Sequence, residues 1–84
     1  MDRDQLKREL KELIVTECMK DRAPESLDDA ELLMGPQALL ELDSLDALQI
    51  ALAVQQRYGK RIEGNNETRL ALASVDALAD FILS

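Results

Sequence analysis

A serine flanked by two carboxylates is the part of this sequence whose residue types could do chemistry. Ser44 stands between Asp43 and Asp46, at the point where an irregular acidic segment meets an apolar run with helical spacing. A serine hydroxyl is a weak nucleophile at neutral pH unless a base lies beside it, and the chain contains no histidine. We therefore expect no catalytic residue, and we interpret Ser44 as a residue that another protein modifies.

Ser44 also has a purely structural interpretation. Serine is a favoured N-cap residue, because its side-chain oxygen accepts a hydrogen bond from an otherwise unpaired backbone N–H in the first turn of a helix. The two interpretations of Ser44 are compatible.

Length and composition predict one small helical domain that spans residues 1–84. A chain of this size buries somewhat over about 60% of its unfolded surface and has no room for an enclosed active site. Two aromatic residues, three glycines and two prolines, among many Ala, Leu, Glu and Gln residues, favour helices over sheet.

The single cysteine excludes a disulfide framework. Together with the lack of a signal peptide or a long apolar segment, it predicts a cytoplasmic protein without membrane insertion. Cys18 continues an apolar stripe, so we expect it to pack in the core. No metal site is expected, because histidine is absent and Asp28, Asp29 and Glu31 lack the alternating ligands and glycine of a calcium loop.

The net charge of −7 lies entirely between residues 21 and 56, while both ends of the chain are neutral. An acidic surface around Ser44 would attract basic partners and repel nucleic acid and anionic membranes. Exposed charge pairs contribute only about 0.2–1 kcal/mol each, so we expect this surface to speed and orient encounters more than it tightens complexes.

Two segments precede Ser44. Apolar residues at helical spacing predict a helix over Asp4–Lys20. Pro24 and Gly35-Pro36 predict that residues 21–43 form a long loop. The loop contains too many leucines for full exposure, so we expect it to be held across the bundle, with a helical turn within 28–33 or 37–41.

The helix predicted over Ser44–Tyr58 has two apolar faces. At about 100° per residue, one face forms the core with Ala47, Ile50, Ala51, Val54 and Tyr58. The opposite face carries the residues that we expect to recognise partners: Leu45, Leu48 and Leu52, with Gln49, Gln55 and Gln56, bordered by Asp43 and Asp46. The alternative is that the leucines of this face pack under the loop. The alanines 47, 51 and 53 leave space beside the helix.

The remainder of the chain completes a small four-helix bundle. Gly59 is expected to end the second helix in a left-handed conformation, and Gly64-Asn65-Asn66 is a turn signal that precedes a short helix over Glu67–Leu72. Ser74 is expected to cap a last helix. The fold class is therefore all-α, with three longer helices, one short helix and a long first loop. We expect a monomer.

The motif Asp43-Ser44-Leu45, the helix that follows it and Gly59-Lys60-Arg61-Ile62 resemble the acyl carrier protein family in its stand-alone form, over nearly the whole chain. The resemblance implies that Ser44 carries a covalent 4'-phosphopantetheine arm, which holds acyl groups as thioesters. It also implies a phosphopantetheinyl transferase (holo-carrier synthase) that adds the arm. Further implied partners are acyl-loading and ketosynthase-type enzymes with basic docking surfaces, and an acyl chain that enters between the helices.

Several positions depart from the family pattern. Glu41 replaces a common glycine, Glu63 replaces a frequent proline, and glutamines stand at 49, 55 and 56 where carriers of primary fatty acid synthesis usually have glutamates. These departures favour polyketide or another specialised acyl pathway over housekeeping fatty acid synthesis. Two alternatives remain open: an aminoacyl or D-alanyl carrier with the same arm, and a helical interaction module that is never modified.

Overall fold

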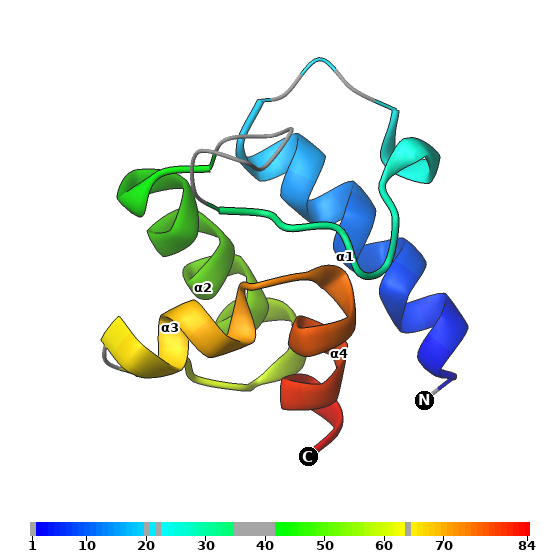
Figure 1. Ribbon diagram of the computed structural model, residues 1–84. Coiled ribbons are helices and arrows are strands. Elements are labelled where there is room, and N and C mark those ends of the chain that lie inside the picture. Colours follow the sequence, from blue (N-terminus) through cyan, green and yellow to red (C-terminus); the bar gives the residue numbers. More distant parts are fainter. Residues whose placement is uncertain (1, 20, 22, 35–41, 64) are drawn as a thin grey trace.

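Four α-helices dominate the described chain in the computed structural model (Figure 1). They are α1 (Arg3–Glu17), α2 (Ser44–Tyr58), α3 (Asn65–Ala71) and α4 (Val75–Leu83), with a 3-10 helix, η1 (Pro24–Ser26), after α1. The structure describes residues 2–19, 21, 23–34, 42–63 and 65–84. Within these ranges the only extended pairing is an isolated bridge between Met34 and Leu42. The prediction of an all-α fold is confirmed.

Helix α1 begins where Asp2 accepts a hydrogen bond from the backbone N–H of Asp4 at 3.0 Å. Its inward side chains, Leu6, Leu10, Leu13 and Ile14, are all buried. The helix ends at Glu17 and not near Lys20, which lies outside the described residues. The reason for the early end is Met19, which adopts a left-handed conformation with φ of 53° and cannot continue the helix. Cys18 is half-buried against the core.

Helix α2 has the predicted bounds, Ser44–Tyr58. It ends at Gly59, whose φ of 72° is the left-handed conformation that was expected. The N–H of Gly59 donates to the carbonyl of Gln55 at 3.0 Å, which satisfies one of the last carbonyls of the helix. Ala47, Ile50 and Val54 are buried, as predicted.

The first loop differs from prediction within its described part. The helical turn expected within 28–33 is wrong, and the one expected within 37–41 lies outside the described residues. Leu27 and Leu33 are buried in the core. The N–H of Leu33 donates to Ala73 at 3.1 Å and the N–H of Asp76 donates to Asp29 at 2.9 Å. These long-range bonds to residues 73–76 hold the segment in a non-helical conformation.

Helix α3 starts at Asn65, two residues before the predicted start at Glu67. Gly64, part of the expected turn signal, lies outside the described residues. Ser74 caps α4 as predicted, by accepting from the N–H of Ala77 at 3.1 Å. The inward residues of α4, Val75, Leu78, Ala79 and Ile82, are buried. Helix α1 packs against α2 and α4, and α3 packs against α4.

Ion pairs connect α1 to the loop and to α4. Lys7 lies 3.2 Å from Asp29 and 2.6 Å from Asp76, and Lys11 lies 2.8 Å from Asp29. Hydrogen bonding from Lys11, and then from Lys7, lowers the pKa of Asp29. Hydrogen bonding to Asp76, and then to Asp29, raises the pKa of Lys7. Both shifts favour the charged forms, so the network ties three segments together at neutral pH.

Among the described residues, no helix combines the length and the apolar character that crossing a membrane requires.

Candidate attachment and docking site

Ser44 is the first residue of α2, and Asp43, not Ser44, is its N-cap. The carboxylate of Asp43 accepts from the N–H of Asp46 at 2.9 Å, and the carboxylate of Asp46 accepts from the N–H of Asp43 at 3.3 Å. This reciprocal pair is a capping box. The structural interpretation of Ser44 as the cap is therefore wrong, because the longer aspartate side chain one residue earlier fills that role.

The Ser44 hydroxyl is exposed and makes no hydrogen bond with the described residues. The other three serines all use their hydroxyls locally. Ser26 donates to Ala23 at 2.6 Å, Ser84 donates to Phe81 at 2.7 Å, and Ser74 accepts from Ala77 at 3.1 Å. Ser44 is thus the serine in this chain whose oxygen is neither covered nor committed to the backbone.

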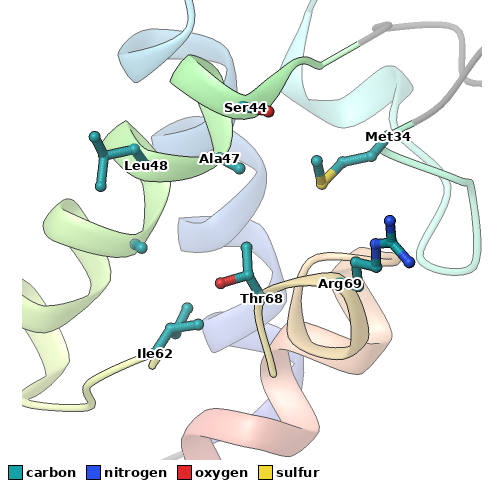
Figure 2. A pocket seen from close by; sticks show the side chains of 8 residues that line it. Met34, Ser44, Ala47, Leu48, Ile62, Thr68 and Arg69 are labelled. Atoms are coloured by element: carbon teal, nitrogen blue, oxygen red, sulfur yellow. The ribbon is translucent and has the colours of Figure 1, made fainter. Parts of the chain in front are cut away.

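A pocket of about 620 Å³ opens beside Ser44, between α2 and α3 (Figure 2). Figure 2 shows Met34 on the side opposite Ser44, while Ile62 and Thr68 line the space lower down. The residues that line the pocket are Met34, Ser44, Ala47, Leu48, Ala51, Ile62, Thr68 and Arg69. Ala47 and Ala51 are short side chains on the pocket side of α2, so the predicted space beside this helix exists at these two positions.

The second apolar face of α2 is exposed. Leu45, Leu48 and Leu52 are 70%, 55% and 52% exposed. Because these side chains are exposed, the alternative that this face packs under the loop is wrong. We call the three exposed leucines the leucine strip.

The polar residues expected to recognise partners do not all face one way. Gln49, Gln55 and Gln56 are exposed. Gln56, however, lines a second, smaller groove of about 430 Å³ between α1 and α2, together with Ala53 and Arg57. Ala53 therefore also has space beside it, as predicted, but in a different groove from the one that Ala47 and Ala51 line.

The acidic residues around Ser44 are partly engaged elsewhere. Asp29 is held by Lys7 and Lys11 on α1. Asp43 and Asp46 remain near Ser44, but each also accepts a backbone hydrogen bond in the capping box. Because Lys7 and Lys11 offset the charge of Asp29, the negative charge near Ser44 is smaller than the net charge of −7.

The surroundings of Ser44 fit a phosphodiester on its oxygen. The backbone N–H groups of Ser44 and Leu45 belong to the first turn of α2, which has no intrahelical partner for them, and the positive end of the helix dipole lies there. Asp43 and Asp46 oppose an anion, but at about 7 Å in water each repulsion is only about 0.6 kcal/mol. Arg69 at the pocket edge supplies an opposite charge.

Sequence reasoning missed four of the lining residues: Met34, Ile62, Thr68 and Arg69. They come from the loop, from the connection after α2 and from α3. Their proximity to Ser44 depends on how these segments fold back onto α2, and no local pattern signals it. No cluster of potential metal-binding side chains occurs within the described ranges.

The chain matches no model of a known protein family, and a comparison with curated proteins finds no match.

Proposed function

We propose that this protein is an acyl carrier protein and that Ser44 is the residue to which a 4'-phosphopantetheine arm is attached. The observation that carries the proposal is the state of the Ser44 hydroxyl. It is exposed, it makes no hydrogen bond with the described residues, and it stands at the N-terminus of α2 beside a pocket. The resemblance of the motif and its helix to carrier proteins supplies the chemical identity of the attached group.

The attachment needs a separate enzyme, since no described residue accepts a hydrogen bond from the Ser44 hydroxyl as a catalytic base would. A phosphopantetheinyl transferase would remove the proton from the Ser44 oxygen. The bond from that oxygen to phosphorus forms, the pyrophosphate bond of coenzyme A breaks, and adenosine 3',5'-bisphosphate leaves. The arm supplies a thiol that holds an acyl group as a thioester. The exposed position of Ser44 lets a transferase reach the hydroxyl without unfolding α2.

The chain's own part is to present the arm and to shelter its cargo. The pocket between α2 and α3 begins at Ser44 and is lined mainly by apolar side chains, including Ala47, Ala51 and Ile62. It is suited to an acyl chain. The leucine strip lies on an exposed side of the same helix and is suited to brief docking of partner enzymes with basic rims.

The proposed partners are enzymes of a specialised acyl pathway, such as polyketide synthesis. The exposed surface of α2 carries the neutral residues Gln49 and Gln55, and Gln56 lines the groove towards α1. A neutral face of this kind would bind weakly to enzymes that select carriers by a row of glutamates. The exposed leucines would then contribute more to partner choice than charge does.

One rival function has an observation in its favour. The leucine strip would also serve an interaction module that is never modified, since exposed leucines on one helix face are typical of protein contacts. An aminoacyl or D-alanyl carrier would share Ser44 and the arm and would differ only in its loading enzyme.

The test is the intact mass of the purified protein after incubation with coenzyme A and a transferase of broad specificity. A carrier gains the mass of one phosphopantetheine. The matched variant Ser44→Ala, which keeps Asp43 and its cap, should gain nothing. An unmodified wild-type protein would favour the interaction module, and a modified alanine variant would move the site to another residue.

A further inference from the structure

Arg69 is the charged side chain of the pocket beside Ser44. The other described lining residues are neutral: Met34, Ser44, Ala47, Leu48, Ala51, Ile62 and Thr68. The chain as a whole has 17 acidic and 10 basic residues, so a pocket whose described lining has one positive charge and no carboxylate differs in sign from the protein. The pocket therefore favours an anion that the rest of the surface disfavours.

The guanidinium of Arg69 is not used to stabilise the fold. It makes no ion pair or hydrogen bond with the described residues, whereas Lys7 and Lys11 are paired within the α1 network and Arg61 lies 3.0 Å from Glu63. Glu67, on the same helix, accepts from the N–H of Glu63 at 3.3 Å. The acids of this region thus have partners other than Arg69.

The position of Arg69 suits a ligand that starts at Ser44. Figure 2 shows its side chain rising from α3 on the pocket side that faces Met34. Thr68, the preceding residue, adds a hydroxyl to the same lining. A guanidinium stays protonated at any pH of interest and presents paired donors that match the two oxygens of a carboxylate or a phosphate.

We propose that Arg69 binds anionic oxygens of the group that Ser44 carries. This inference rests on the proposed function, and it adds a substrate class to it. The oxygens belong either to the phosphodiester of the arm or to a carboxylate on the cargo. In both cases the pocket binds a ligand with a hydrogen-bond acceptor near Arg69, and it does not bind a hydrocarbon chain alone.

The test follows the side-chain Nε–H signal of Arg69 by NMR in four forms of the isotope-labelled protein: unmodified, loaded from coenzyme A, loaded from butyryl-coenzyme A and loaded from succinyl-coenzyme A. Butyryl and succinyl chains have the same number of carbons and differ by the terminal carboxylate. Arg57 provides the internal control, because it is an exposed arginine that lines the other groove. Intact mass establishes loading in each case.

A shift of the Arg69 signal on loading from coenzyme A alone assigns the phosphodiester as the ligand. A shift that occurs with the succinyl chain and not with the butyryl chain assigns the carboxylate. If the phosphodiester is the ligand, the phosphorus NMR signal of the arm should change in Arg69→Met and not in Arg57→Met. If the carboxylate is the ligand, this signal should change in neither variant.

The inference is overturned if Arg69 responds no more than Arg57 in every loaded form. It is also overturned if butyryl and succinyl shift Arg69 equally while coenzyme A alone does not, because the pocket is then merely filled. A protein that gains no mass at all contradicts the proposed function itself, so the two failures are distinct.

Discussion

Asp43 and Ser44 have different roles at the start of α2, although they are neighbours. Asp43 satisfies the backbone of the first turn through the capping box with Asp46. Ser44, at the first helical position, has an exposed hydroxyl that forms no hydrogen bond within the described part of the chain. The cap and the proposed attachment point are therefore consecutive residues, and modification of Ser44 would leave the cap in place.

The two residues should differ in their effect on stability. Asp43→Ala removes the N-cap and should cost about 0.5–2 kcal/mol. Ser44→Ala removes a hydroxyl that makes no hydrogen bond with the described residues and should change the free energy of unfolding by less than about 0.5 kcal/mol. Chemical denaturation of the two variants measures this difference. Equal losses would contradict the assignment of the cap to Asp43. Asp43→Asn keeps a good cap while removing the charge, so it is the better variant for testing partner recognition.

Tyr58 offers a pH measurement on a single residue, because it is the only tyrosine in the chain. Partial burial, and a hydrogen bond from its hydroxyl to Glu9 at 3.0 Å, raise the pKa of Tyr58 to about 12. The folded state therefore holds this proton more tightly than the unfolded state, whose pKa is about 10. The associated stability is present below about pH 10 and is lost as the pH rises from there towards 12.

Tyrosinate absorbance should accordingly titrate well above 10 in the native protein and near about 10 in strong denaturant. Tyr58→Phe removes the hydrogen bond and should cost about 0.5–1.5 kcal/mol at neutral pH. A native titration midpoint equal to the denatured one would show that the contact between α1 and the end of α2 is absent in solution.

At the scale of the element, α2 has one buried apolar face and one exposed apolar face. Ile50 is completely buried, and Leu52 is 52% exposed. The helix is not a surface helix with one apolar stripe, since the leucine strip is also apolar. Under the proposed function, this exposed strip is the surface on which partner enzymes dock.

Mutations on the two faces of α2 should have different effects on stability and on modification rate. Ile50→Ala leaves a cavity and should cost about 2–5 kcal/mol in stability. Leu52→Gln should change stability by less than about 0.5 kcal/mol and yet slow arm transfer or acyl loading by a partner enzyme. Leu52 is chosen over Leu48 because Leu48 also lines the pocket. A Leu52 variant that unfolds as readily as the Ile50 variant, or that is modified at the wild-type rate, would contradict this division.

At the scale of the whole molecule, the ion pairs of Asp29 with Lys11 and Lys7 hold the first loop against α1 and α4. Because pairing lowers the pKa of Asp29, its contribution to stability is present above the ordinary carboxyl pKa of about 3.9 and is lost as the pH falls below that value. The loop, in turn, brings Met34 to the pocket edge.

Asp29→Asn should therefore lower the denaturation midpoint at neutral pH, and its difference from the wild type should shrink below about pH 4. Asp28→Asn is the matched control, since Asp28 is exposed and its carboxylate makes no ion pair with the described residues. If both variants behave alike across the pH range, the network does not hold the loop.

The sequence predicts those parts of the fold that local patterns specify. The bounds of α2 follow from the motif at Ser44 and from Gly59, and the cap of α4 follows from Ser74. The end of α1 could not be predicted in this way, because Met19 adopts a left-handed conformation that is unusual for a methionine. The non-helical segment around Leu33 depends on a hydrogen bond to Ala73, forty residues later.

The candidate site, too, could be predicted from the sequence only in part. Ser44 and the leucine strip could be identified from residue types and from the angle between positions on one helix. The pocket could not, because Met34, Ile62 and Arg69 reach it from three different segments. Their arrangement depends on the packing of α3 against α4 and of the loop against α1.

The attachment of an arm to Ser44 is tested most directly by the mass of the protein purified from its own cells, with the modified residue located by peptide fragmentation. The account predicts a population that carries phosphopantetheine, and fragments that place it on Ser44 and not on Ser26, Ser74 or Ser84. A protein that is unmodified throughout, or an arm on one of the other serines, would contradict it.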